Sequence, residues 1–488
     1  MDFTELYKSY VYSKTENSEL SRNKLIDAAE IDRSTFYKNV KGKRIPTPEQ
    51  YSSVMRCLIK KFGLTEDDES KIAELDRAYF NCVYDDMSYD DFLRSMDFTR
   101  WFGKLERQSE EPFSDKDYLF KTVKNKIVSE YIDGSRIGRR RKSAKSCVRV
   151  FLPLKDKYFK DDKAVELFGT INNPDVGIKH LIPYMDNDSM EVDDIRTLIQ
   201  FLDGAECDYE AHSSGAGIKM SGMPYPYYVV TDTEVMLISD SLDVVRVTNI
   251  GDVKRFADEF DKIYDNCESV VTSFKDKEDM VLDMEKYSGY KTYFVQYYPG
   301  ISYISDAELA KKYVPLPFRQ PLLKHADIMK HLNYVEVISE RGIRDFMKNG
   351  VVDEAGFRLC CDEETIKKAK DKMLKRIGYS LVIADDSLIP ITSRFTMSVI
   401  AGEAALFVPN DRSDYILSVS DKQLVSQLID FLDVLSESRY VLTAGESRKF
   451  LGGGCNSKVV ICLVCFTTSH ITKSAITSGT YMYSSVSL

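Results

Sequence analysis

The sequence predicts a multidomain protein with an all-α head, a helical connector and a large α/β body built on a mixed sheet. Its 488 residues suit about two to four domains, and 43% hydrophobic with 30% charged residues is typical of a globular chain. Apolar residues keep a helical spacing to about residue 131, whereas strand-like runs alternate with amphipathic helices from Cys147 onward. We therefore expect a head over 1–70, a connector over 71–146, a body over 147–450 and a tail over 451–488.

The head is predicted to consist of short helices. A first helix over 2–14 is indicated by apolar residues at helical spacing, namely Phe3, Leu6, Tyr7 and Tyr10. Residues 21–61 then have the pattern of two short helices joined by a tight turn, followed by a basic loop and a third helix. This pattern favours a helix-turn-helix.

Local residues predict where the second of these helices begins and ends. The turn is expected at Glu30-Ile31-Asp32, and Asp32 or Ser34 can cap the helix that follows. Gly42 is expected to end that helix in a left-handed conformation. Ile45-Pro46-Thr47-Pro48 then predicts an extended link, because the residue before a proline is kept out of the helical region.

The second helix of the pair carries polar side chains that suit contact with DNA. A recognition helix presents such side chains near its N-terminus to base edges in the major groove, which is about 12 Å wide. Arg33 can pair with a guanine, Ser34 and Thr35 can reach bases or phosphates, and the remaining cations can neutralise phosphates. The predicted DNA-binding residues are Arg22, Arg33, Ser34, Thr35, Tyr37, Lys38, Lys41, Lys43 and Arg44. A generic helical hairpin with a solvated basic face is the alternative.

The charge of the chain is unevenly distributed. Residues 21–61 contain ten Lys or Arg and four Asp or Glu, a local charge of +6. Because the whole chain has a net charge of −10, the remainder outside this stretch carries −16. A basic module on an acidic body predicts that double-stranded DNA is contacted locally while the body is repelled from the phosphates.

The stretch resembles the Cro/C1-type (XRE) helix-turn-helix family of bacterial and phage regulators. The resemblance covers about 65 residues and rests on S-R-N-K-L at 21–25, A-A-E-I-D-R-S-T-F at 28–36, V-K-G-K-R-I-P at 40–46 and F-G-L-T at 62–65. It implies a five-helix DNA-binding head, often dimeric on palindromic sites, whose positions 22, 33, 34, 35 and 38 face the DNA. The family often has Gln and Glu where this chain has Arg22 and Lys41, so no base preference is carried over.

The connector contains one tryptophan and a run of basic residues. Trp101 is expected to anchor a local core, and the helical segment can provide a dimer surface. A basic run in residues 133–145 includes Arg136, Arg139, Arg140, Arg141 and Lys142. The run suits a solvated linker, with an auxiliary arm that contacts phosphates as the alternative.

The body is predicted to alternate strands with helices. Strands are expected at 148–152, 227–230, 235–238, 292–298, 334–338, 380–384, 396–400, 404–408 and 415–419. Helices are expected at 163–170, 193–202, 252–271, 306–313, 321–332, 340–349, 363–377 and 422–435. The similar order of elements in its two parts raises the possibility of two related halves.

The body shows no strong catalytic or metal-binding motif. His212 and Lys219 flank Gly215-Ala216-Gly217, an arrangement that suits an ordinary loop better than a phosphate-handling one. His325 and His331 are six residues apart on a predicted helix, which turns them to different faces and argues against a shared metal. Asp385-Asp386 and Asp362-Glu363-Glu364 suit solvated turns and helix starts. We expect no catalytic residue, metal or cofactor.

The aromatic runs of the body are expected to pack on its sheet. They are Tyr225, Tyr227 and Tyr228 and, later, Tyr293, Phe294, Tyr297 and Tyr298. A ligand pocket lined by them is the alternative.

The ten cysteines and the N-terminus predict a cytoplasmic protein. The cysteines follow no disulfide spacing, and Cys462 with Cys465 forms a lone C-x-x-C, for which redox or zinc binding is a weak alternative. The first residues lack the pattern of a signal peptide, and no apolar run approaches the roughly 20 residues that span a bilayer. The last 38 residues or so, rich in Ser and Thr, suggest a flexible tail.

These observations predict a cytoplasmic, sequence-specific DNA-binding transcriptional regulator that is not an enzyme. Its body would sense an unknown small-molecule or protein effector or mediate assembly, and we expect a homodimer without membrane contact. One alternative is an enzyme with a hydrolase-like α/β body that uses His212 and Lys219 and carries a DNA-binding head. Another is a structural protein whose body only oligomerises.

Overall fold

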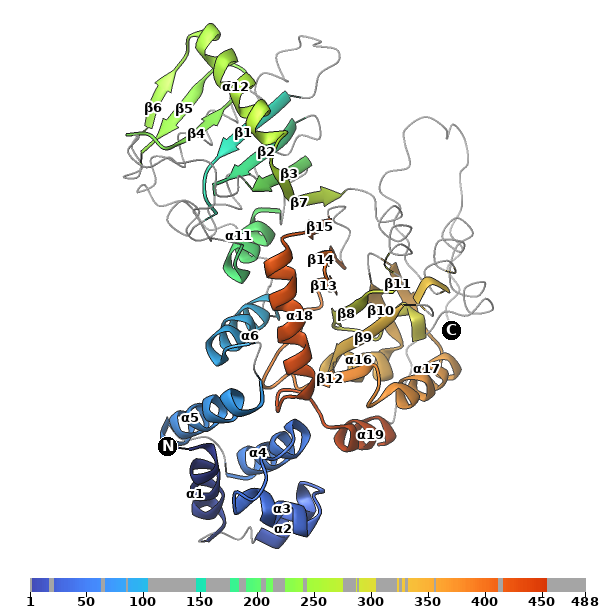
Figure 1. Ribbon diagram of the computed structural model, residues 1–488. Helices are drawn as coiled ribbons and strands as arrows, with labels where there is room; N and C mark the ends of the chain where they lie inside the picture. Colours follow the sequence, from blue (N-terminus) through green and yellow to red (C-terminus); the bar gives the residue numbers. More distant parts are fainter. Residues whose placement is uncertain are drawn as a thin grey trace, which may run out of the picture.

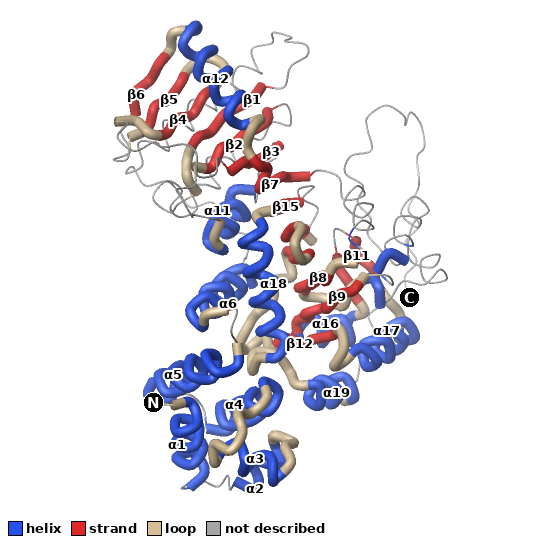
Figure 2. Tube along the Cα trace, in the orientation of Figure 1, coloured by secondary structure: helices blue, strands red, loops and turns tan. Residues whose placement is uncertain are grey.

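The computed structural model describes most of the head and the core of the body. The described residues are 2–16, 22–62, 66–84, 87–103, 146–154, 176–183, 190–202, 208–213, 224–239, 244–274, 287, 289–303, 323, 327–329, 332–354, 357–410 and 416–453. Among them, no helix is both long and apolar enough to cross a membrane. Figures 1 and 2 show a helical region at one end of the molecule and a long sheet extending away from it.

The N-terminal region folds as helices around one aromatic core. The helices are α1 (Phe3–Glu16), α2 (Arg22–Ala28), α3 (Arg33–Val40), α4 (Pro48–Phe62) and α5 (Glu66–Val83). Phe36 and Val40 are buried in this core, as their positions predict, and the rings of Tyr51 and Tyr79 stack with centroids 4.0 Å apart. Helix α5 continues through the expected boundary at residue 70 and contributes Tyr79 to the same core.

Of the expected connector, helix α6 (Tyr89–Gly103) belongs to the core of the body. Its buried Phe92, Met96 and Phe98 pack in the same hydrophobic cluster as strands from both ends of the sheet. The basic run at 133–145 lies outside the described residues, and the side chain of Trp101 is not described.

The body is built on a large mixed sheet, which confirms the α/β prediction. Thirteen described strands lie in the order β12-β9-β8-β13-β14-β15-β7-β3-β2-β1-β4-β5-β6. The strands of the first part are β1 (Ser146–Phe151), β2 (Val176–Ile182), β3 (Asp208–Ser213), β4 (Tyr227–Val230), β5 (Val235–Ile238), β6 (Val244–Val247) and β7 (Glu268–Phe274). Those of the second part are β8 (Lys291–Gln296), β9 (Asn333–Ser339), β12 (Leu381–Ala384), β13 (Phe395–Ile400), β14 (Ala404–Pro409) and β15 (Ile416–Val419).

The two parts of the sheet have the same topology. In each, the first three strands are parallel neighbours, β1-β2-β3 and β8-β9-β12. In each, the next three strands form an antiparallel meander from the other side of the first strand, β4-β5-β6 and β13-β14-β15. Strand β7 pairs with both β3 and β15 and joins the two parts.

Helices cover both faces of the sheet. Helices α6, α11 (Val192–Leu202) and α18 (Lys422–Glu437) pack on one face, around the largest core cluster. On the opposite face, α12 (Ile250–Tyr264) covers the first part. The second part is covered by α16 (Glu340–Asn349), α17 (Glu363–Arg376) and the hairpin β10 (Val351–Glu354)–β11 (Phe357–Cys360). A short 3₁₀ turn, η4 (Ile301–Tyr303), and the final helix α19 (Ala444–Gly452) complete the described elements.

One predicted helix of the body is too long. The sequence predicted a single helix over 252–271, but α12 ends at Tyr264 and Glu268–Phe274 is β7. Val270 and Val271 of β7 are buried between β3 and β15, so they serve a strand rather than a helix face. The expected helices at 163–170 and 306–313 lie outside the described residues, and of the one at 321–332 only residues 323, 327–329 and 332 are described.

Candidate nucleic-acid interface

The turn between α2 and α3 is set by local contacts. Glu30 adopts a left-handed backbone conformation with a φ of 54°. Asp32 caps α3: its carboxylate accepts hydrogen bonds from the Thr35 backbone N–H at 2.9 Å and from the Thr35 hydroxyl at 3.2 Å. The backbone hydrogen bond from Thr35 is the main cause that lowers the pKa of Asp32. The helix therefore begins where the sequence predicts.

The loop after α3 is fixed at both ends. Gly42 has a φ of 69°, and a Cβ at this position would lie 2.0 Å from Cγ2 of Thr4. The Lys43 backbone N–H donates to the Lys38 carbonyl at 2.9 Å, which closes the end of the helix. Further on, the hydroxyl of Tyr79 donates to the Pro46 carbonyl at 3.0 Å. These contacts hold the basic loop against the head.

Eight of the nine predicted DNA-binding residues lie on α3 or in the loop that follows, and Arg22 begins α2. The exposed members are Arg33, Ser34, Lys38, Lys41, Lys43 and Arg44, and the half-buried ones are Arg22, Thr35 and Tyr37. The Arg22 guanidinium lies over the Tyr12 ring at 4.5 Å, and the Lys41 ammonium lies 6.0 Å from the centre of the Tyr37 ring. Within the described residues, Arg33, Lys38, Lys43 and Arg44 form no ion pair, so their charges are available to a ligand.

The head is joined to the body through Arg56 of α4. Its side chain is 1% exposed and donates to the Arg439 carbonyl at 2.8 Å and to the Asp385 carboxylate at 2.9 Å. Its Nε lies 3.2 Å from the carboxylate of Glu446. Burial opposes ionisation of Asp385, but hydrogen bonds from Ser387 and the charge of Arg56 hold the pKa of Asp385 below its usual value.

The joint corrects the expectation that Asp385 and Asp386 lie in a solvated turn. Asp385 is buried against Arg56, and Asp386 accepts hydrogen bonds from the Ser339 hydroxyl at 2.9 Å and the Arg341 backbone N–H at 2.6 Å. Both carboxylates therefore serve structure at the ends of β9 and β12. Asp362, in contrast, caps α17 as the sequence predicts.

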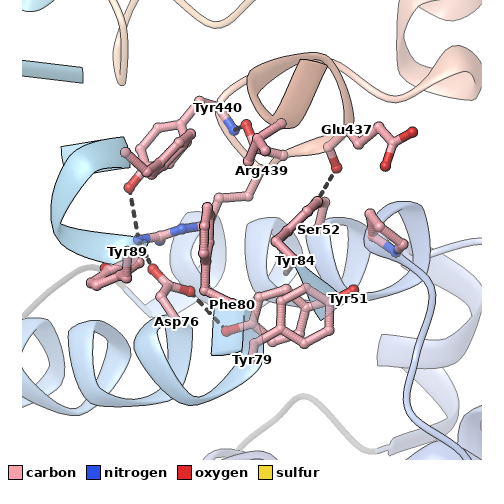
Figure 3. Close-up of a pocket in the computed structure, with 14 residues that line it drawn as sticks. Tyr51, Ser52, Asp76, Tyr79, Phe80, Tyr84, Tyr89, Glu437, Arg439 and Tyr440 are labelled. Carbon is pink, nitrogen blue, oxygen red and sulfur yellow. Dashed lines mark hydrogen bonds and ion pairs between the residues drawn. The ribbon is translucent and has the colours of Figure 1, made fainter. Parts of the chain in front are cut away.

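A second part of the joint surrounds Asp76 of α5 (Figure 3). The Asp76 carboxylate lies 2.6 Å from the Arg439 guanidinium and accepts a hydrogen bond from the Tyr51 hydroxyl at 2.7 Å. Burial raises the pKa of Asp76 despite these two partners. The Ser52 hydroxyl donates to the Glu437 carbonyl at 3.0 Å. The aromatic side chains drawn in Figure 3 line a cavity of about 40 Å³, too small for more than a few atoms.

A third contact links the turn before α3 to the last helix of the body. The ammonium of Lys449 on α19 pairs with the carboxylate of Glu30. A Cβ on Gly445, one turn earlier on α19, would lie 2.7 Å from that carboxylate. The three contacts together fix the orientation of α3 relative to the body.

His212, the histidine of the enzyme alternative, has structural partners, and so does His180. His212 stacks on the Tyr264 ring at 3.8 Å, and its two nitrogens lie 2.8 Å from the Tyr264 carbonyl and 3.1 Å from the Glu210 carboxylate. His180 is fully buried between the Leu152 carbonyl and the Tyr209 hydroxyl, and burial lowers its pKa to about 4. Lys219 and residues 215–217 lie outside the described residues.

The other candidate residues of the body give no further site. Tyr293 and Phe294 are buried in the sheet, in line with the packing expected of the aromatic runs. His325, His331, Cys462 and Cys465 lie outside the described residues. Within the described segments, no group of three or more His, Cys, Asp or Glu side chains is placed to hold a metal ion.

Comparison with known proteins does not assign the chain to a family. No protein-family model matches it, and no curated protein matches it. Among solved structures, the chain is similar to a polyphosphate kinase from Porphyromonas gingivalis with 9% identity and a TM-score of 0.19. That match covers 66% of this chain and 49% of the kinase, so the chain spans about half the length of the structure it matches. A likeness this slight supports no argument about fold or function.

Proposed function

We propose that the protein is a sequence-specific DNA-binding regulator whose head contacts double-stranded DNA through α3 and the loop that follows. The observation that carries this proposal is the arrangement of the exposed cations. Arg33, Lys38, Lys43 and Arg44 are exposed on α3 and the loop that follows, and within the described residues none of them lies in an ion pair. Clustered cations on one helix and its loop are the electrostatic pattern of a DNA-binding surface.

We propose different roles for these side chains. With the N-terminus of α3 in the major groove, Arg33 and Ser34 meet base edges while Lys38, Lys41, Lys43 and Arg44 meet phosphates. The Thr35 hydroxyl donates to Asp32, which leaves its lone pairs free to accept from a base or from water. We assign Arg22, at the start of α2, a further phosphate contact.

The body then acts on DNA binding through the joint. Because Arg56, Asp76 and Glu30 fix the head to three parts of the body, a change in the body is passed to the orientation of α3. A small-molecule or protein effector regulates the protein only if it binds one arrangement of the head better than another. A homodimer would place two such heads on the two halves of a palindromic site.

The double variant Arg33→Ala/Lys38→Ala tests this function. Duplexes that bind the wild-type chain are first selected from a randomised pool. The variant should no longer bind them specifically, because one base contact and one phosphate contact are removed. Affinity is measured by fluorescence anisotropy over a series of salt concentrations. The slope of log K against log salt should also become shallower by about one for the lost phosphate contact.

A matched control carries the same change of charge at the far end of the molecule. Arg255 and Lys262 are exposed on α12, distant from the head in Figure 1. Arg255→Ala/Lys262→Ala should therefore bind the selected duplexes like the wild type. Equal binding by Arg33→Ala/Lys38→Ala and the control, or no selection of any duplex, would contradict the proposal.

A further inference from the structure

Three helices of the body differ in charge from the other helices that surround them. Helices α16, α17 and α19 together contain eleven Lys or Arg and six Asp or Glu, a net charge of +5. By the same count the net charge is −4 for α5, −2 for α18 and −1 each for α6, α11 and α12. Since the chain outside residues 21–61 carries −16, removing this +5 leaves −21 on the rest. We call α16, α17 and α19 the basic flank.

The basic flank is next to the head. Lys449 and Gly445 of α19 contact Glu30, which lies in the turn that leads into α3. Figure 1 shows α19 beside the head helices, with α16 and α17 next to it. One of the three positive helices, α19, therefore contacts the turn before α3, and α16 and α17 lie next to α19.

Side-chain contacts join the three helices into one surface. The Arg344 guanidinium of α16 lies over the Phe450 ring of α19 at 4.9 Å. On the other side of α19, Arg448 reaches the carbonyl of Ile377, the residue after α17, at 3.5 Å. These contacts hold the three basic helices together as neighbours.

Several cations of the basic flank are exposed and take no part in an ion pair among the described residues. Arg341, Lys348 and Lys375 are exposed, and within the described residues none of the three forms an ion pair. Tyr379, two residues beyond Ile377, is 86% exposed and can donate a hydrogen bond to a phosphate. A cluster of exposed cations attracts a polyanion locally even where the rest of the molecule is acidic.

We propose that the basic flank is a second DNA-binding surface, which contacts the phosphates of duplex flanking the segment bound by α3. This inference rests on the proposed function of the head and adds a contribution of the body to it. The flank neutralises phosphates without reading bases, so it raises affinity and salt dependence rather than sequence preference. With the flank, the protein also covers a longer stretch of duplex than the head covers alone.

Binding to duplexes of two lengths tests the proposal. The full chain is titrated with random-sequence duplexes of about 14 and about 30 base pairs, and log K is measured against log salt for each. In the variant Arg341→Ala/Lys348→Ala/Lys375→Ala, the slope on the long duplex should become shallower by about 3, one for each lost phosphate contact. On the short duplex, which α3 and its loop fill, the slope should equal that of the wild type.

A control variant distinguishes the effect of the basic flank from the effect of removing positive charge anywhere on the body. Lys254→Ala/Arg255→Ala/Lys262→Ala removes the same types and number of exposed charges from α12, and it should leave both slopes unchanged. Equal effects of the two triple variants, or an unchanged slope on the long duplex in the flank variant, would overturn the proposal while leaving the head's function intact. Failure of the wild type to bind either duplex would instead overturn both. Melting curves of both variants confirm that they are folded.

Discussion

Gly42 is the residue on which the shape of the basic loop depends most. Its left-handed φ of 69° favours glycine, and the space where a Cβ would lie is occupied by Thr4 of α1. The loop that carries Lys41, Lys43 and Arg44 is thus held close to α1 by a contact that only glycine permits.

Replacing Gly42 with alanine should destabilise the protein by about 2–4 kcal/mol, because it adds a steric clash to the cost of a left-handed alanine. Gly402 is the control: its φ is 75°, but nothing lies within 4 Å of a Cβ there, so Gly402→Ala should cost about 1 kcal/mol. Adding Thr4→Ala to Gly42→Ala should recover part of the loss. Urea unfolding followed by circular dichroism measures the three variants, and equal costs at the two glycines would exclude the clash.

Residues with a local role could be predicted from the sequence, whereas those of the joint could not. The Asp32 cap and the left-handed Gly42 follow from the residues beside them. Arg56, by contrast, adds to the positive charge counted for residues 21–61 but is neutralised by Asp385, 329 residues away. No periodicity within α4 distinguishes a buried, paired arginine from one that faces DNA.

Helix α4 connects the two functional parts of the molecule. It packs against α3 through the head core, and its Ser52 and Arg56 contact the segment that follows α18. Glu446 caps α19 through Thr443 and pairs with Arg56, so the start of α19 and the docking of the head depend on the same carboxylate. The orientation of the head is therefore coupled to the folding of the last helix of the body.

Removing the buried cation should weaken this coupling strongly. Arg56→Ala should destabilise the protein by about 3–5 kcal/mol, because it leaves Asp385 charged and buried without its partner. Arg56→Lys, which retains the charge but lacks the forked geometry, should lie in between. Lys60, 58% exposed and 3.6 Å from Glu446, is the control, and Lys60→Ala should cost less than about 1 kcal/mol.

The free energy of unfolding of these variants is measured by urea titration of the full chain. A cost for Arg56→Ala no greater than that for Lys60→Ala would show that the ion pairs do not hold the head in place.

Elements of the body were predictable where the hydrophobic period was unambiguous. Helix α16 was predicted with its observed bounds, and α18 within two residues. The segment 252–271 was misassigned because Val270 and Val271 continue the apolar spacing of α12 by chance across the turn at Asp265–Cys267. Their burial depends on β3 and β15, which come from distant parts of the chain.

Across the whole molecule, the two parts of the sheet repeat one topology, but only the second part borders the head. Strands β1–β6 match β8, β9, β12, β13, β14 and β15 in order and directions, which the sequence suggested only through the order of its elements. Helices α16, α17 and α19 belong to the second part. Helix α12 covers the first part, at the end of the molecule away from the head (Figure 1). Among the described helices that cover the two parts of the sheet, those with a net positive charge are therefore on the part next to the head.

Hydrogen exchange on the full chain, with and without a duplex selected from a randomised pool, tests the central claim most directly. If the head binds DNA through α3 and the loop that follows, amide exchange should slow in residues 22–44 when the duplex is added, and exchange in α12 should not change. Slower exchange confined to segments outside residues 22–44, or no change anywhere with duplex in excess, would contradict the account.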